Sequence, residues 1–264
     1  MHPFERLRMV ARAGSEDPGV VARQAASALA AIAGEPAAVV TACRRLVARH
    51  PTSGPLWWLA ARVLASADPS GEAWRAADEL RHDLTARALA DALPDGAIVT
   101  VLGSPRQAGT ALARRGDVRA LVVDVRGDAG RLLYELDEEG GDVAAVAESG
   151  LAAAVLASTV VVLEADALGP DGLVALAGSR AAAAVARHAG VPVWAVAGVG
   201  RVLPAGLWAA LVGHLDEVPE PWVAPAELVP LDLVDVIVGP GGPESLDEAL
   251  ARAGCVAVAE LTRR

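Results

Sequence analysis

The sequence predicts an α/β protein: an N-terminal all-helical domain followed by a Rossmann-like, mostly parallel sheet domain. Two observations lead to this prediction. Up to about residue 88, apolar residues recur at helical spacing, whereas beyond residue 93 short apolar runs alternate with helical segments. Strands that alternate with helices are typical of a parallel sheet covered on both faces. We therefore expect a helical domain over residues 1–92 and a Rossmann-like domain over residues 93–264.

The helical part is expected to contain four helices. They cover 20–33, 36–48, 55–67 and 71–89. Gly34 and Pro36 end the first helix, and Leu93-Pro94-Asp95-Gly96 separates the helical part from the rest of the chain. Trp57 and Trp58 fall on the third helix, where packing in a core or an interface is expected of them.

The second part alternates strands and helices. Strands are expected at 97–102, 119–124, 143–146, 159–163, 193–197, 234–238 and 256–258. One helix is expected to end at residue 115, and others are expected at 130–139, 150–157, 207–215 and 244–253. One more helix begins near residue 178.

Composition excludes several classes of function. The formal net charge of −10 argues against nucleic acid as a partner, because phosphate neutralisation needs a basic surface. The longest apolar run near the middle, 151–163, is too short to span a membrane. No signal peptide is recognised, so a cytoplasmic protein is expected. The chain contains no lysine, which excludes Schiff-base chemistry and a lysine-bearing phosphate loop.

The two cysteines, Cys43 and Cys255, lie far apart in the sequence and have neither metal-binding nor redox spacing. Both are expected to act as small buried apolar residues. No metal site and no cofactor are predicted.

A carboxylate follows the apolar run 160–163, at the expected carboxyl end of a strand. In open α/β sheets ligands bind at these ends, which makes Asp166 a candidate site residue. A helix-capping or turn-capping aspartate is an equally good interpretation of its position.

Further polar residues follow other strands. Ser104, Arg106 and Gln107 lead directly into a helix, whose N-terminus suits a phosphate group. Arg126 follows the second strand, and Arg201 follows the strand 193–197. Arginines at these places could hold phosphate oxygens. The alternative is that they are solvated and paired with nearby acids.

The ordered set of these segments resembles the alpha, beta and delta subunits of eukaryotic translation initiation factor 2B. That superfamily includes methylthioribose-phosphate isomerase and ribose bisphosphate isomerase. The segments are Pro51-Thr52-Ser53, Asp124-Val125-Arg126, Glu164-Ala165-Asp166, Asp171-Gly172, Gly178-Ser179 and Gly190-Val191-Pro192. They occur in the family's order and cover most of the chain.

The resemblance implies a phosphorylated small molecule as partner and a homodimer or larger oligomer, in which the final strands form the interface. It implies a catalytic position for Asp166. It adds candidate ligand-binding residues to those at the strand ends: Arg49, His50, Thr52, Gly178, Ser179 and Arg180.

Departures from the family pattern bear on activity. The loop 104–107 lacks the cysteine that works opposite the aspartate in the isomerases. Leu176-Ala177 replaces the family's Asn-Lys pair, and His50 replaces an arginine, although Arg49 is adjacent. Moving a proton between sugar carbons requires a placed acid and a placed base, and Asp166 supplies only one of them.

Three functions are compatible with the sequence, and the first is the one that we predict. The first is binding of a phosphorylated sugar or nucleotide without isomerase activity. The second is an aldose–ketose isomerase acting on a phosphorylated sugar, with Asp166 as general acid. The third is a non-catalytic interaction subunit of an oligomer whose former pocket is filled.

Overall fold

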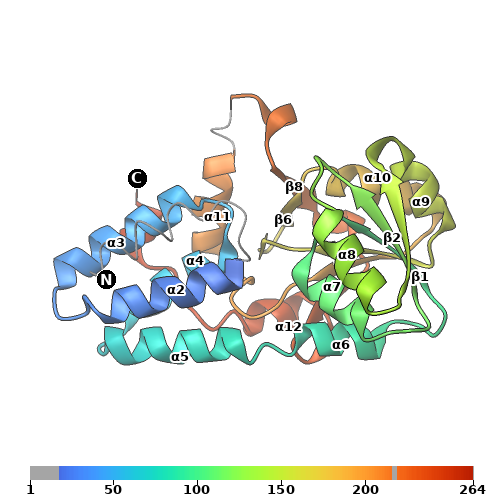
Figure 1. Ribbon diagram of the computed structural model, residues 1–264. Helices are drawn as coiled ribbons and strands as arrows, with labels where there is room; N and C mark the ends of the chain where they lie inside the picture. The colour runs from blue at the N-terminus through green and yellow to red at the C-terminus, as the bar shows by residue number, and fades with distance from the viewer. Residues whose placement is uncertain (1–17, 216–218, 264) are drawn as a thin grey trace.

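The computed structural model describes residues 18–215 and 219–263. The chain forms a helical lobe and an α/β lobe, joined along one side by the segment from α5 to α6 (Figure 1). The N-terminal helices are α2 (Pro18–Ala30), α3 (Pro36–Arg49), α4 (Gly54–Ala65), α5 (Pro69–Arg81) and α6 (Thr85–Ala92). Trp57 and Trp58 of α4 are 0% and 2% exposed, which confirms their expected place in a core.

The single helix predicted over 71–89 is wrong, because the segment forms two helices. The Asp83 carboxylate accepts hydrogen bonds from the backbone N–H (3.0 Å) and the hydroxyl (2.6 Å) of Thr85. An aspartate that binds the backbone two residues on competes with helix continuation. The chain therefore leaves α5 at His82 and begins α6 at Thr85.

The main sheet has seven strands in the order β10-β9-β7-β4-β1-β2-β3, and all pairs are parallel except β9 with β10. The bounds are β1 (Ile98–Leu102), β2 (Arg119–Asp124), β3 (Asp142–Ala147), β4 (Val160–Glu164), β7 (Val193–Val196), β9 (Val236–Gly239) and β10 (Gly242–Glu244). The order reverses between β1 and β4. The carboxyl ends of these two strands therefore border the crevice in which such sheets bind ligands.

Helices cover both faces of this sheet. They are α7 (Arg106–Ala113), α8 (Gly130–Glu138), α9 (Leu151–Ala157), α10 (Ser179–Ala189) and α12 (Leu246–Ala251). Successive residues of β4 alternate between two cores: Val160 and Val162 pack with α6, α7 and α8, whereas Val161 and Leu163 pack with α9, α10 and α12. This alternation is the period-2 geometry of a strand buried on both faces.

A second, three-stranded antiparallel sheet was not predicted. It consists of β5 (Ala167–Leu168), β6 (Gly172–Leu176) and β8 (Ala226–Pro230). The predicted strand over 256–258 is also wrong. Those residues have irregular backbone that leads into the short helix α13 (Ala259–Thr262).

The helical lobe also takes in late segments of the chain. Leu207 and Leu211 of α11 (Ala205–Leu215) share a core with α2, α3, α4 and α5, as does Leu261 of α13. The last described helix, α13, packs against α3 and α11. No helix among the described residues is long and apolar enough to cross a membrane.

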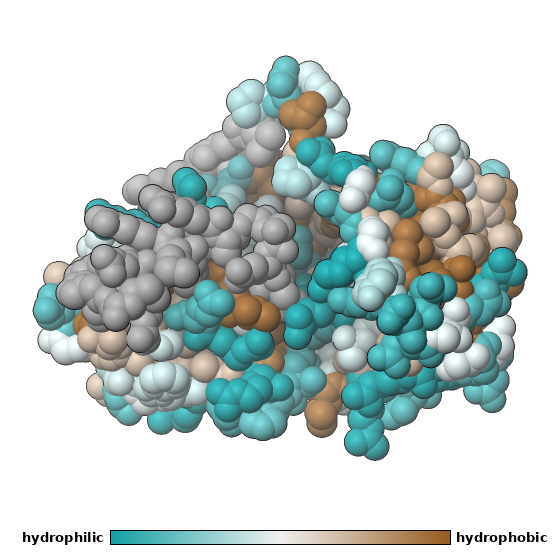
Figure 2. Space-filling model, viewed as in Figure 1, coloured by the Kyte–Doolittle hydropathy of each residue, from teal (hydrophilic) through white to brown (hydrophobic). Residues whose placement is uncertain are grey.

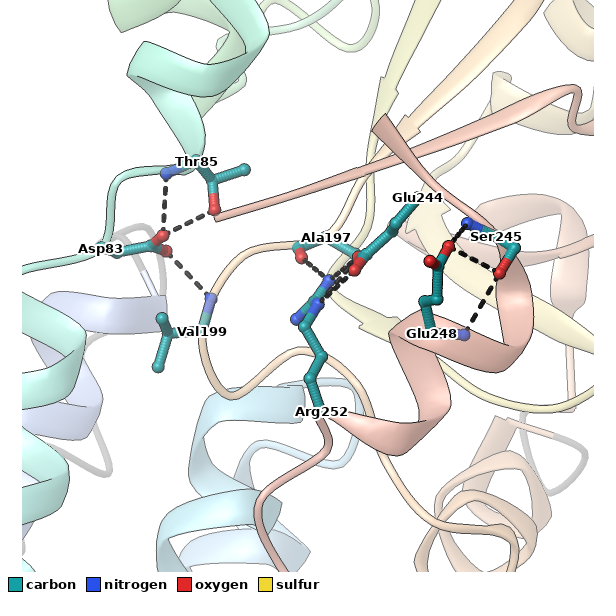
Figure 3. A network of polar contacts seen from close by, with 8 residues as sticks. All are labelled: Asp83, Thr85, Ala197, Val199, Glu244, Ser245, Glu248 and Arg252. Atoms are coloured by element: carbon teal, nitrogen blue, oxygen red, sulfur yellow. Dashed lines mark hydrogen bonds and ion pairs between the residues drawn. The ribbon is translucent and has the colours of Figure 1, made fainter. Parts of the chain in front are cut away.

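Two polar contacts join distant segments near the carboxyl end of β7 (Figure 3). The Asp83 carboxylate accepts a hydrogen bond from the backbone N–H of Val199 at 3.0 Å. The Arg252 guanidinium donates to the Glu244 carboxylate, with an Nε–Oε1 distance of 2.7 Å, and to the carbonyl of Ala197 at 2.6 Å. The second contact fixes α12 and β10 against the end of β7.

Replacing Arg252 by methionine tests the contribution of this contact. The substitution leaves the Glu244 carboxylate, 14% exposed, without its cation. We expect the free energy of unfolding to fall by about 1–3 kcal/mol, measured by urea denaturation. The matched control is Arg75→Met, since Arg75 pairs with Glu72 but is 57% exposed, and there a loss of about 0–1 kcal/mol is expected. Equal losses in the two variants would contradict this account.

Candidate functional site

Asp166 lies where three elements meet. Its backbone N–H donates to the carbonyl of Val174 in β6 at 2.7 Å, and its carbonyl accepts from the N–H of Gly54, at the start of α4, at 2.9 Å. The Asp166 side chain is 34% exposed. The position therefore joins the end of β4, the small sheet and the helical lobe, beside the crevice between β1 and β4.

A buried arginine lies beside this aspartate. Arg201, in the loop after β7, is 4% exposed. Its guanidinium donates to Glu164 Oε1 at 2.9 Å and to the carbonyl of Ala165, and its Nη1 lies 3.9 Å from Asp166 Oδ1. A buried charge needs such compensation, because removal from water otherwise costs several kcal/mol. Arg201 thus neutralises the carboxylates around it.

The second oxygen of Glu164 binds the start of α7. Glu164 Oε2 accepts hydrogen bonds from the backbone N–H groups of Gln107 (2.8 Å) and Ala108 (3.2 Å). These are the groups that a phosphate would use at a helix N-terminus. A carboxylate from β4 therefore already occupies the anion position after β1.

The neighbouring helices have the same arrangement. Asp124 Oδ1 accepts from the N–H of Ala129, immediately before α8, at 3.0 Å. Glu227 Oε1 accepts from the N–H of Arg180, in the first turn of α10, at 2.9 Å. Each of the helices α7, α8 and α10 thus begins at a carboxylate of the chain itself.

The residues predicted in the loop after β1 are bound within the protein. The Ser104 hydroxyl donates to the carbonyl of Asp128 and accepts from the N–H of Leu132 at 3.3 Å. The Gln107 amide donates to Asp83 at 2.5 Å, while Gln107 Oε1 is buried without a hydrogen-bond partner among the described residues. Arg106 is exposed.

Arg126 and the start of α10 lie on separate loops. Arg126 Nη1 donates to the carbonyl of Val223 at 3.0 Å. Its φ of 60° is positive, unlike that of any other described non-glycine residue, and such a backbone is strained for arginine. Ser179 is buried at the start of α10, and Gly178 before it has a φ of 95°, which favours glycine.

The segment between α3 and α4 approaches Asp166. An added Cβ on Gly54 would lie 2.6 Å from the Asp166 carbonyl oxygen, so only glycine fits there. The hydroxyl of Ser53 is buried and has no hydrogen-bond partner among the described residues. His50 and Thr52 precede it half-buried, and Arg49 is exposed at the end of α3. The structure therefore brings the backbone of Gly54 to Asp166.

An apolar side chain lies over the loop after β1. A Cβ added to Gly103 would lie 2.7 Å from Leu176 Cδ2. The Leu176 side chain therefore packs against the loop after β1.

The two cysteines lie elsewhere. Both pack with the core of the helical lobe, and burial raises the pKa of each thiol to about 12. No group of three or more His, Cys, Asp or Glu side chains among the described residues could hold a metal ion.

The sequence pattern indicated Asp166 and placed Arg201 among the arginines that could hold phosphate, but it did not indicate Glu164 or Asp83. Glu164 directly follows the apolar run of β4, and a charge there was the available signal. For Asp83, 116 residues before its partner Val199, the sequence gives no signal.

No family model and no curated protein matches the chain. Solved structures do. The translation initiation factor eIF-2B of Pyrococcus horikoshii OT3 is 14% identical with a TM-score of 0.78, over 94% of this chain and 98% of that one. A chain of the tetrameric eIF2B-beta2-delta2 complex of C. thermophilum is 18% identical with a TM-score of 0.76, over 94% of this chain and 92% of that one.

An isomerase is also among the similar structures. The 5-methylthioribose 1-phosphate isomerase of Pyrococcus horikoshii OT3 is 17% identical with a TM-score of 0.64, over 96% of this chain and 87% of that one. These similarities confirm the α/β fold with an N-terminal helical part, and they agree with the resemblance found in the sequence. The chain therefore has the fold that eIF2B subunits share with 5-methylthioribose 1-phosphate isomerase.

Proposed function

We propose that this protein is a non-catalytic subunit of an oligomer, built on the eIF2B fold, whose anion positions are filled by its own carboxylates. The observation that carries this proposal is the occupation of the α7 N-terminus by Glu164, with Asp124 and Glu227 in the same role at α8 and α10.

Electrostatics disfavours a phosphate at these positions. Two unit charges of like sign about 4 Å apart repel by about 4 kcal/mol at an effective dielectric constant of 20. A phosphate at α7 would have to displace Glu164, and displacement would separate that carboxylate from Arg201, which is 4% exposed. The internal carboxylate therefore competes with any anionic ligand.

Isomerase chemistry of the family type is also disfavoured. Asp166 has Arg201 and Glu164 as neighbours. The two thiols lie in the helical lobe, and the side chain against the loop after β1 is that of Leu176. A proton transfer between sugar carbons would lack the second placed group.

Two observations support association of the chain into an oligomer, one from a similar structure and one from this protein. One of the similar structures is a tetrameric complex of eIF2B subunits. At the β10 edge of this sheet, a groove of about 360 Å³ lies between α6 and the turn that joins β9 to β10. Leu84, 57% exposed, lines the groove with Ala88 and Pro243. We assign this edge as the interface between copies of the chain, in a homodimer or larger oligomer.

Binding of a phosphorylated sugar or nucleotide is the second candidate. The buried hydroxyl of Ser53, without a partner among the described residues, favours it, as does the strained backbone of Arg126. In this alternative Asp166, Thr52 and the exposed guanidinium groups of Arg106 and Arg126 contact the ligand. An isomerase would use Asp166 as its general acid.

A thermal-shift experiment with Glu164→Gly distinguishes the two candidates. The substitution vacates the N-terminus of α7, so inorganic phosphate should raise the melting temperature of this variant. At about 100 times the dissociation constant the gain is about 2.7 kcal/mol. The unchanged protein and Glu164→Gln, in which a side chain still fills the position, should show no shift. Phosphorylated sugars and nucleotides should likewise not stabilise the unchanged protein.

A ligand-induced shift in the unchanged protein would contradict the first proposal. If Arg126→Ala abolished that shift, the second candidate would be supported. Absence of a phosphate effect in every variant, Glu164→Gly included, would mean that the α7 N-terminus is not the anion position that we assign.

Substitution of Leu84 tests the proposed interface. Leu84→Asp places a charge in the groove between α6 and β10, and burying an unpaired charge there opposes association. We expect the mass measured by multi-angle light scattering to fall to that of one chain. The matched control is Leu156→Asp, since Leu156 is 64% exposed on α9, and it should leave the assembly intact. A monomeric parent protein would refute the proposal.

Thiol reactivity tests the absence of a nucleophilic cysteine. Because burial raises the pKa of Cys43 and Cys255 to about 12, both thiols stay protonated at pH 8 in the folded protein. We expect very slow reaction with a chromogenic disulfide reagent, and rapid reaction of both thiols in urea. Raised pKa values also predict that stability falls as the pH rises from about 9 to 12, because the unfolded chain ionises first. Rapid reaction of one thiol in the folded protein would contradict this prediction.

A further inference from the structure

The sheet has a second edge, which the proposed function does not use. β3 pairs with β2 in regular parallel register over six residue pairs, from Arg119 with Asp142 to Asp124 with Ala147. No other strand among the described residues pairs with its outer side. Alternate backbone N–H and C=O groups of β3 therefore point outward, away from β2.

Proteins normally protect such edges with lysine, proline, a bulge or a very short strand. None of these devices is present in β3, whose sequence is Asp-Val-Ala-Ala-Val-Ala over residues 142–147. Ala145 and Ala147 are exposed, and their methyl groups would not obstruct an incoming strand. The opposite edge differs, because β10 has only three residues and packs against α6.

Acidic residues surround the open edge. Glu135, Asp137, Glu138 and Glu139 occupy the last turn of α8 and its end, all exposed, and Glu148 follows β3. The last turn of α8 has no basic residue. Carboxylates at a helix C-terminus are opposed by the helix dipole. Among the described residues, Asp137, Glu138, Glu139 and Glu148 take part in no ion pair.

Exposed apolar side chains lie on the two helices that pack against β3, one on each face of the sheet. Tyr134 of α8 is 66% exposed and Leu156 of α9 is 64% exposed. In Figure 2 hydrophobic residues reach the surface of the α/β lobe between the positions that α8 and α9 have in Figure 1. The edge thus combines free backbone groups with negative charge.

We propose that β3 is a docking strand for an extended, basic segment of a partner protein, which adds to the sheet as an eighth main-sheet strand. Backbone groups of the segment pair with the outer side of β3. Its arginine or lysine side chains lie near the carboxylates that end α8 and near Glu148. A second copy of this chain fits less well, since antiparallel pairing of two β3 strands would bring Asp142 towards Glu148 of the other copy.

Fluorescence anisotropy with a labelled peptide of alternating arginine and valine tests this proposal. The peptide should bind, and its affinity should fall with rising salt. Two control peptides should not bind: alternating glutamate and valine, which reverses the charge, and the arginine–valine peptide N-methylated at every residue, which keeps the charge but removes the N–H donors of both strand edges. Equal binding of the N-methylated peptide would overturn the proposal, because charge alone would then account for the contact.

Amide hydrogen exchange locates the contact. The peptide should slow the exchange of amides within residues 143–147 and leave the groove between α6 and β10 unchanged. If these amides become protected as the protein concentration rises without peptide, a second copy covers the edge and the proposal fails. Absence of any protection in β3 would also overturn it.

Variants separate the strand edge from general acidity. The double variant Ala145→Lys and Ala147→Lys blocks the edge as natural edge strands do, and should weaken peptide binding about tenfold or more. The matched control, Ala37→Lys with Thr41→Lys, adds the same charge to exposed positions of α3 and should change the affinity less than about twofold. Glu138→Gln with Glu139→Gln, which leaves the strand intact, should weaken binding about two- to fivefold. Leu84→Asp should not affect peptide binding, so this proposal and that of the oligomer fail independently.

Discussion

The carboxylate of Glu164 holds together the elements around the point between β1 and β4 where the strand order of the main sheet reverses. One oxygen accepts from two backbone N–H groups of α7, and the other binds the guanidinium of Arg201. These contacts join the end of β4, the helix after β1 and the loop after β7. Arg201 is almost fully buried, and the carboxylates of Glu164 and Asp166 lie against its guanidinium.

The polar contacts continue from this point to the helical lobe. Gln107, whose backbone N–H binds Glu164, donates its side-chain amide to Asp83, and Asp83 also accepts from Val199 and Thr85. Gly54 at the start of α4 donates to the Asp166 carbonyl. The place where related folds are expected to hold a substrate is therefore where this protein joins its lobes. Because its polar groups are used for internal contacts, this position fits the proposed oligomer subunit better than an enzyme that converts a substrate there.

Much of the fold could be predicted because it depends on local pattern. The runs that became β1, β2, β4 and β7 are mostly apolar, as is typical of strands covered on both faces, and the helices between them have clear periodicity. Predictions were wrong where tertiary contacts decide. Asp83 interrupts the helix expected over 71–89. The antiparallel pairing of β6 with β8, some fifty residues apart in sequence, forms a second sheet where no strand was expected.

The site could be predicted only in part for a similar reason. Strand ends indicated where polar residues gather, and Asp166 lies at such an end. Which carboxylate meets which helix is a long-range property: Glu164 and Gln107 are 57 residues apart, and Glu227 and Arg180 are 47 apart. A helix N-terminus after a strand predicts an anion, and the sequence cannot say whether that anion is a ligand or a side chain.

Crystals of the protein soaked in selenate, whose anomalous scattering marks bound oxyanions, would test this account most directly. The account predicts no anomalous peak at the N-termini of α7, α8 and α10, with the Glu164 carboxylate within hydrogen-bonding distance of the Gln107 N–H. A selenate ion bound at the start of α7, with Glu164 turned away from Arg201, would contradict it.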